Sequence, residues 1–187
     1  MSGIGEGTSA QLIGTLGFAG LLSGLALVVA YEKTLPVILE NRAAALRVAV
    51  LRVVPGATEM QRLEPQGGAL VVTPKGEGAA IYAAYGEGGR FVGYAIPSAG
   101  NGFADVISLL YGYEPSKGAI VGLSVLESRE TPGLGDKIYK DAAFAENFRE
   151  LLVSPSITAV KHGKKMAANE VDCITGATIS SKACTGA

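Results

Sequence analysis

The sequence predicts an α+β domain behind a single N-terminal transmembrane helix. A long apolar segment without charge lies near the N-terminus, and short β-rich runs separated by turn formers fill residues 69–126. Helical periodicity is confined to the regions before and after those runs. Because the strands follow one another along the chain, we expect an antiparallel-rich sheet with flanking helices.

The apolar segment carries no charged residue between Glu6 and Glu32 and is densest from Leu12 to Ala30. As a helix, residues 7–31 would span about 37 Å at about 1.5 Å per residue, which exceeds the roughly 30 Å hydrocarbon layer of a bilayer. A cleaved signal peptide is the alternative. However, no Lys or Arg precedes the segment, and the apolar run exceeds the usual length of about 7–15 residues. We therefore expect an uncleaved anchor over residues 1–34.

An amphipathic helix is expected over Leu35–Val53, where apolar residues recur at three- and four-residue steps until Pro55-Gly56 ends the pattern. Residues 35–56 are thus a connecting helix, and residues 57–187 are the folded domain. The chain ends at Ala187 soon after a helix start, so we expect an incomplete C-terminus.

Within the domain, strands and turns are predicted to alternate, and a helix and a last strand follow a Gly/Pro loop. The expected strands are Ala69–Val72, Ala80–Tyr85, Phe91–Ile96, Asp105–Tyr111, Ala119–Leu126 and Ile157–Val160; the turns are Pro74-Lys75-Gly76, Gly86–Gly89, Pro97–Gly102 and Pro115–Gly118; the loop is Glu130–Asp136 and the helix Ala142–Leu152.

Composition excludes several classes of function. Hydrophobic residues make up 48% of the 187 residues and charged ones 18%, below the roughly 25% charged usual in soluble domains. A net charge of -1 gives no large basic surface that would attract nucleic acid. The cysteines, Cys173 and Cys184, and the single histidine, His162, match no zinc spacing. We expect the cysteines to be small packed residues rather than a disulfide, and no metal site.

Hydroxyl groups crowd a predicted helix start at Thr178–Ser181. Free backbone N–H groups at such a start favour an anion such as phosphate. Gly176 and Ala177 leave the backbone open just before Thr178, so a bulky group could be attached to that hydroxyl. The alternative is a plain helix N-cap, for which Thr and Ser are favoured without any ligand.

Two motifs extend this interpretation. Thr175-Gly176-Ala177-Thr178 stands inside Asp172-x-x-Thr-Gly-Ala-Thr-x-Ser-Ser, and a strand precedes the loop sequence Glu-Thr-Pro-Gly-Leu-Gly-Asp-Lys-Ile at 130–138. Both motifs, and the order of anchor, helix ending in Val54-Pro55-Gly56-Ala57 and small domain, resemble the FMN-binding subunits of Rnf- and Nqr-type electron-transfer complexes. The alternative for the loop is a surface turn built on Pro-Gly.

The resemblance implies that FMN is attached as a phosphoester to the hydroxyl of Thr178. A threonine hydroxyl needs an activating base or metal, so the resemblance implies a separate flavin transferase that uses FAD and magnesium and recognises Asp172. Small side chains at Gly176 and Ala177 would give that enzyme access. Cys173 departs from the family, in which a small residue is expected. The phosphate would be contacted by Thr175, Ser180 and Ser181, and the isoalloxazine ring by Glu130, Thr131, Gly133, Leu134, Gly135 and Lys137.

The function implied is electron transfer through covalent FMN, between iron–sulfur or flavin partners among the other membrane subunits of an ion-translocating complex. The cofactor carries out the redox chemistry, so no catalytic residue is assigned. The Rnf-type ferredoxin:NAD oxidoreductase is favoured, and the Nqr-type NADH:quinone oxidoreductase is the alternative. Two further interpretations are an anchored extracytoplasmic binding module without a redox role and a free-standing FMN carrier for an extracytoplasmic reductase.

Two indications about topology disagree. Lys33, Arg42, Arg47 and Arg52 follow the apolar segment and nothing basic precedes it, so the positive-inside rule would place the domain in the cytoplasm. The resemblance implies a single-pass protein of the cytoplasmic (inner) membrane with its FMN domain on the extracytoplasmic side. Our expectation follows the resemblance.

Overall fold

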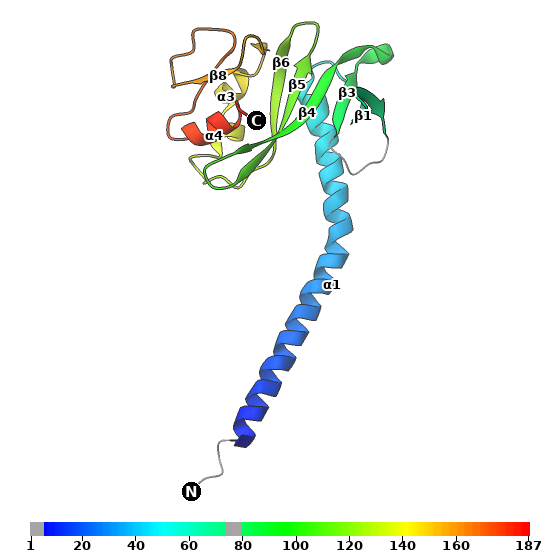
Figure 1. Cartoon of the computed structure of the whole chain (residues 1–187), viewed down its shortest axis with the longest axis vertical. Helices are drawn as coiled ribbons and strands as arrows, with labels where there is room; N and C mark the ends of the chain where they lie inside the picture. The colour runs from blue at the N-terminus through cyan, green and yellow to red at the C-terminus, as the bar shows by residue number, and fades with distance from the viewer. Residues whose placement is uncertain (1–5, 74–79) are drawn as a thin grey trace. The chain divides into compact units, whose positions relative to one another are not determined.

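The computed structural model describes residues 6–73 and 80–187, so the expected turn at Pro74-Lys75-Gly76 lies outside the described residues. The chain divides into two compact units, Met1–Ala44 and Ala45–Ala187. Helix α1, Glu6–Val53, begins in the first unit and ends in the second (Figure 1). The anchor and the connecting helix, predicted as separate helices, form one helix, which continues through Pro36.

Among the described residues, α1 is the helix long and apolar enough to cross a membrane, over Ser9–Val53. Its most apolar window has a mean hydropathy of 2.2, and none of that window is buried. Leu16 and Leu27, for example, are 72% and 70% exposed. The length and composition expected of the anchor are therefore present, although a signal sequence near an N-terminus shares both properties.

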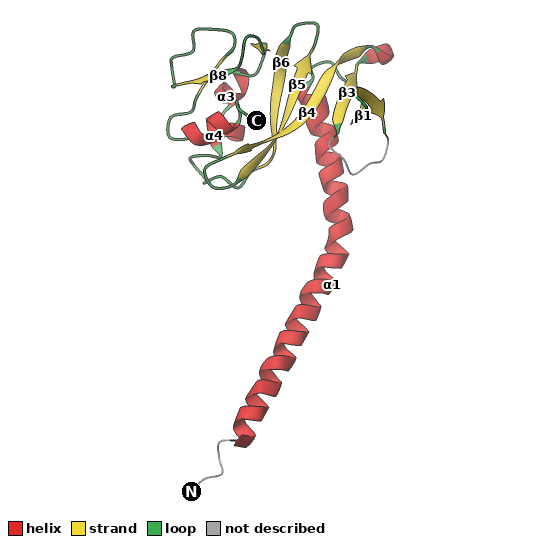
Figure 2. Ribbon diagram, in the orientation of Figure 1, coloured by secondary structure: helices red, strands yellow, loops and turns green. Residues whose placement is uncertain are grey.

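Seven of the described strands of the second unit form one sheet, in which every neighbouring pair is antiparallel (Figure 2). A separate parallel pair, β8–β9, lies beyond it. In spatial order the sheet strands are β2 Ala69–Val72, β1 Glu59–Gln66, β3 Ile81–Tyr85, β4 Phe91–Asn101, β5 Val106–Glu114, β6 Ala119–Glu127 and β7 Leu151–Leu152. The remaining elements are the 3-10 turn Glu87–Gly89, α2 Lys137–Lys140, α3 Ala142–Glu146, β8 Thr158–Val160, β9 Glu170–Asp172 and α4 Thr178–Ala183.

Some predicted elements are wrong in detail. The turn expected at Pro97–Gly102 is strand, because β4 continues to Asn101. Pro97 pairs with Leu110 of β5, whereas the pairing of β4 with β3 ends at Ala95. The missing N–H of Pro97 is therefore tolerated, since β4 is an edge strand on that side beyond Ala95.

The helix expected over Ala142–Leu152 is also too long. Helix α3 ends at Glu146, and Leu151–Leu152 form β7 against β6. Glu150 has a φ of 59°, a left-handed conformation that a helix does not contain. Strand β1 was not predicted, because its charged and amide side chains give no apolar alternation for most of its length.

The end of α1 packs on one face of the sheet, where Val50, Val53 and Val54 are fully or almost fully buried with Leu110 of β5. The opposite face packs against α2, α3 and α4 through a core that contains Leu109, Phe144 and Phe148. Leu109 and Leu110 belong to opposite cores because successive strand residues point to opposite faces. The helices that carry the predicted motifs thus share the second core.

Both cysteines are free and buried, as small packed residues, which confirms the prediction for them. Cys184 is fully buried at the end of α4, and its carbonyl accepts a 2.8 Å hydrogen bond from the Tyr111 hydroxyl of β5. Burial raises the pKa of the Tyr111 hydroxyl, so it stays protonated and able to donate. This contact fixes the end of α4 to the sheet.

Candidate functional site

The loop after β6 is held in shape by its own hydrogen bonds. The amide of Leu134 donates to the carbonyl of Thr131 at 3.2 Å, and Gly133 has a φ of 81°, which favours glycine. Asp136 accepts from the Gly133 amide at 2.8 Å and pairs with Lys140 at 2.6 Å. The hydrogen bond from Lys140 lowers the pKa of Asp136, so the carboxylate stays ionised. Asp136 is a buried organiser of the loop that the sequence analysis did not assign to the site.

Helix α4 begins at Thr178, and the capping position is Ala177, which makes no side-chain cap. The Thr178 hydroxyl has no hydrogen-bond partner in the described part of the chain, and its side chain is exposed. Thr178 therefore does not act as the N-cap that the alternative interpretation required. Gly176, with a φ of 85°, makes the turn that precedes it.

Ser181 serves the fold of the same segment. It is fully buried, and its hydroxyl accepts from the Ile174 amide at 3.1 Å and donates to the Ala177 carbonyl at 2.9 Å. Asp172 accepts from the Gly163 amide at 2.8 Å. Ser181 and Asp172 thus form hydrogen bonds inside the protein, while the Thr178 hydroxyl has no partner among the described residues.

The loop after β6 and the start of α4 enclose a pocket of about 330 Å³. It brings together eight of the predicted site residues and adds two that were not predicted, Phe103 and Ile179. Neither carries a motif signal; each is an apolar residue on an exposed segment, 72% and 51% exposed respectively. The predicted residues that line the pocket are Glu130, Thr131, Leu134, Gly135, Gly176, Ala177, Thr178 and Ser180.

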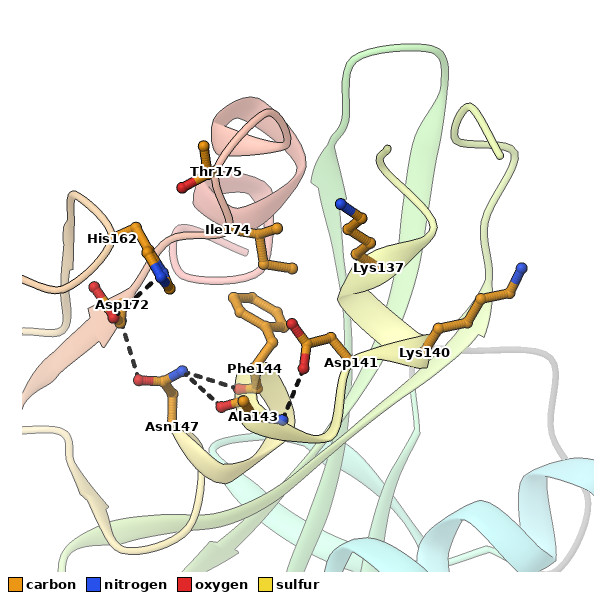
Figure 3. A pocket seen from close by; sticks show the side chains of 10 residues that line it. All are labelled: Lys137, Lys140, Asp141, Ala143, Phe144, Asn147, His162, Asp172, Ile174 and Thr175. Carbon is orange, nitrogen blue, oxygen red and sulfur yellow. Dashed lines mark hydrogen bonds and ion pairs between the residues drawn. The ribbon is translucent and has the colours of Figure 1, made fainter. Parts of the chain in front are cut away.

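Other predicted residues lie elsewhere. Lys137 and Thr175 line a second pocket of about 420 Å³, whose lining also includes Phe144 and Ile174 (Figure 3). Its far side carries His162, 3.6 Å from the carboxylate of Asp172. Ser181 and Gly133 line neither pocket.

Glu130 is the one buried carboxylate that lines the first pocket, at 7% exposure. Its Oε1 accepts from the Ala104 amide at 2.8 Å, and its Oε2 accepts from the Ser180 hydroxyl. Burial by itself raises its pKa, but the hydrogen bonds from Ser180 and from backbone amides at 103–105 outweigh burial and hold the pKa below its usual value. Burial, with a smaller contribution from the charge of Glu130, raises the pKa of Cys184 to about 12.

These features suit a bound cofactor better than acid–base catalysis. The volume lies at the lower end of the roughly 300–1,000 Å³ typical of small-molecule sites. Small residues and the apolar side chains of Leu134 and Phe103 line it, together with the exposed Thr178. In the described residues no group of three or more metal-ligating side chains is present. The lining residues therefore fit a planar cofactor ring.

Comparison with known proteins gives the class. Residues 102–187 match the FMN-binding domain family, and this range includes both motifs and both walls of the first pocket. Over these residues the chain is similar to FMN-binding domains.

Curated relatives indicate which kind of FMN-binding protein this chain resembles. The chain is 37% identical over 101 residues to the G subunit of the Na(+)-translocating ferredoxin:NAD(+) oxidoreductase complex of Acetobacterium woodii, covering 52% of this chain and 46% of the relative. It is 33% identical over 99 residues to the G subunit of the proton-translocating ferredoxin:NAD(+) oxidoreductase complex of Clostridium ljungdahlii, covering 53% and 51%. The chain spans about half the length of these curated relatives.

The fold has a solved counterpart in the C subunit of the Na(+)-translocating NADH-quinone reductase of Parabacteroides distasonis, with a TM-score of 0.60 and 22% identity over 79% of this chain and 88% of that one. Together these matches confirm the resemblance to FMN-binding subunits of the Rnf/Nqr type. They also confirm the predicted fold class, an N-terminal apolar helix followed by an α+β FMN-binding domain.

Proposed function

We propose that this chain is the membrane-anchored electron-transfer subunit of an Rnf-type ion-translocating ferredoxin:NAD oxidoreductase and carries FMN covalently on Thr178. The observation that carries the proposal is the free, exposed hydroxyl of Thr178 at the edge of a pocket whose other wall is the Pro-Gly-Leu-Gly loop. FMN supplies the redox chemistry, accepting and releasing electrons, and the protein supplies attachment, position and electrostatic environment.

Attachment would join the Thr178 oxygen to the phosphorus of the FMN half of FAD, break the bond from that phosphorus to AMP, and release AMP and the hydroxyl proton. The chain offers no base for that proton among its described residues near Thr178. Glu130 already accepts two hydrogen bonds, and His162 lines the other pocket. A separate transferase would therefore supply the base and the metal.

Once attached, the ring would lie between the walls of the first pocket. Leu134, Phe103 and Ile179 offer apolar surface for it, and Gly135 lets the loop approach closely. The predicted phosphate contacts need revision within this proposal: the hydroxyls of Ser180 and Ser181 are already bonded inside the protein, and Thr175 lines the second pocket. We assign Ser180 and Ser181 to holding the shape of the site.

The membrane location and the partners follow from the same proposal. The apolar helix α1 would anchor the chain, the other membrane subunits of the complex would exchange electrons with the flavin, and the domain would lie on the extracytoplasmic side. A covalent bond would keep the flavin from being lost there. The Rnf type is favoured because the relatives at 33–37% identity are G subunits, whereas the similarity to an Nqr-type C subunit at 22% identity supports the fold alone.

The test is the pair Thr178→Val and Thr175→Val in the full chain, expressed with a flavin transferase. We expect a fluorescent band on a denaturing gel for the wild type and for Thr175→Val, and a dark band for Thr178→Val. Mass spectrometry of the peptide with Thr178 should show the addition of FMN minus water. A bare wild-type peptide would instead indicate a binding module without a redox role.

A further inference from the structure

Three walls of the first pocket come from distant parts of the chain and meet at Glu130. The segment after β4 supplies Phe103 and Ala104, and α4 supplies Ser180. Glu130 accepts a hydrogen bond from Ala104, 26 positions away, and another from Ser180, 50 positions away. The Glu130 side chain thus links the segment after β4, which precedes its loop along the chain, to helix α4, which follows that loop.

The space around this carboxylate depends on two glycines. A Cβ added at Gly135 would lie 2.7 Å from the Cβ of Glu130 and 3.1 Å from the Ser180 hydroxyl. A Cβ added at Gly102 would lie 2.7 Å from the Asp105 carbonyl oxygen and would press on the Glu130 carboxylate. Contacts below 3.0 Å force neighbouring atoms to move. The surrounding loops are therefore shaped to fit the Glu130 side chain.

The charge of Glu130 is not neutralised nearby. In residues 6–73 and 80–187 the ion pairs present do not include Glu130. Its hydrogen bonds come from neutral donors, a serine hydroxyl and backbone amides. Neutral donors stabilise a carboxylate without cancelling its charge, so a net negative charge remains in the pocket wall.

We propose that Glu130 is a positioning residue of the flavin site, which fixes the pocket walls and, through its unpaired negative charge, lowers the reduction potential of the bound FMN. The inference rests on the proposed function. Electrons delivered by a partner add negative charge to the flavin, and a fixed anion beside the ring opposes that addition. Glu130 takes no part in the reaction itself. It acts by holding the walls of the first pocket in place and through the electric field of its carboxylate.

The first test needs no flavin. In the full-length Thr178→Val chain, Glu130→Ala should speed hydrogen exchange at the Ala104 amide at least tenfold, because that amide loses its acceptor. Exchange in the interior strand β5 should stay slow, which shows that the fold persists. Glu146→Gln, an exposed carboxylate paired with Arg149 on α3, is the charge-matched control and should leave Ala104 unchanged. Unaltered exchange at Ala104 in Glu130→Ala would overturn the positioning role.

The second test uses the flavin-loaded chain. Glu130→Gln keeps the shape and removes the charge, so the midpoint potential of FMN should move upward, while Glu146→Gln should not move it. Ser180→Ala keeps the charge and removes one tie, and its shift should be smaller than that of Glu130→Gln. A loaded Glu130→Gln chain with the wild-type potential overturns the electrostatic role. A wild-type chain without FMN overturns the proposed function, and the exchange result still decides the positioning role.

Discussion

Two buried carboxylates hold the loop after β6 from its two ends, and each is kept ionised by a different kind of donor. Glu130 accepts from a hydroxyl and from backbone amides, whereas Asp136 accepts from the ammonium of Lys140 and the amide of Gly133. The loop between them carries Leu134, which lines the pocket. The shape of the site is therefore set by hydrogen bonds to charged groups, which are stronger than those between neutral groups.

Replacing Asp136 by Asn should make the stability of the domain less dependent on pH. The pKa of Asp136 in the folded chain lies below its ordinary value of 3.8. Its contribution is therefore complete above that value and is lost as the pH falls through the folded-state pKa. Thermal unfolding of the full chain in detergent should show a deficit in Asp136→Asn at pH 7 that shrinks towards pH 2.

Lys140→Gln is the matched control for that measurement, because it leaves the bond from the Gly133 amide to Asp136 in place. Its deficit at pH 7 should be smaller than that of Asp136→Asn. A deficit in Asp136→Asn that stays constant over the whole pH range would contradict the linkage.

At the residue scale, the sequence motif predicted Thr178 as the attachment residue, but it did not predict which groups the neighbouring side chains bind. Thr178 was assigned from the motif, and its hydroxyl is free and exposed. Ser180 and Ser181 were assigned to the phosphate from the family resemblance, yet both are buried and their hydroxyls form hydrogen bonds inside the protein. Spacing along the chain could not show that Phe103 would reach the same pocket, since that depends on how β4 ends.

At the scale of elements, the end of α1 and the sheet approach each other through glycine. A Cβ on Gly112 of β5 would lie 2.6 Å from the carbonyl carbon of Val53, and one on Gly122 of β6 would lie 2.9 Å from the Val53 Cα. With glycine at both positions, the last turn of α1 can lie directly on the sheet, where Val53 is 1% exposed. These glycines therefore let the helix end become part of the domain core.

Gly112→Ala should therefore destabilise the domain strongly. Inserting an extra methyl group into a packed contact usually costs about 1–3 kcal/mol in the free energy of unfolding, and here the obstacle is backbone, which cannot rotate away. Gly118→Ala is the control, because its Cβ would meet open space and only its φ of 60° is unfavourable, a cost of about 1–2 kcal/mol. Denaturant unfolding in detergent should rank Gly112→Ala as the less stable variant. The opposite ranking would contradict the close packing of α1 on the sheet.

The order and type of most elements could be predicted from apolar patterns, and the exceptions have local causes. The consecutive strands β2 to β6 were predicted because their apolar runs are bounded by glycine and proline. Strand β1 was missed because its stabilisation comes from pairing with β2 and β3 rather than from an apolar face. The helix after Ala142 was extended too far because Phe148 and Leu151 keep helical spacing, although Leu151 belongs to a strand in the same core.

At the scale of the whole chain, the two compact units change which basic residues count in predicting the membrane topology. Arg47 and Arg52 belong to the second unit, Ala45–Ala187, and only Lys33 and Arg42 follow the apolar segment within the first. The positive-inside rule counts charges in short flanking loops, whereas large domains translocate largely regardless of charge. The basic residues that favour a cytoplasmic domain are thus fewer than the sequence alone suggested.

Labelling of an introduced cysteine decides the side of the membrane. Met166 is 94% exposed, and the native thiols, Cys173 and Cys184, are 2% and 0% exposed, so background labelling should be low. In Met166→Cys, a membrane-impermeant maleimide should label spheroplasts before lysis, because we propose an extracytoplasmic domain. In Ser2→Cys, the same reagent should label only after lysis. The reverse pattern would place the flavin domain in the cytoplasm, and a mature chain that lacks position 2 would show that the apolar segment is a cleaved signal rather than an anchor.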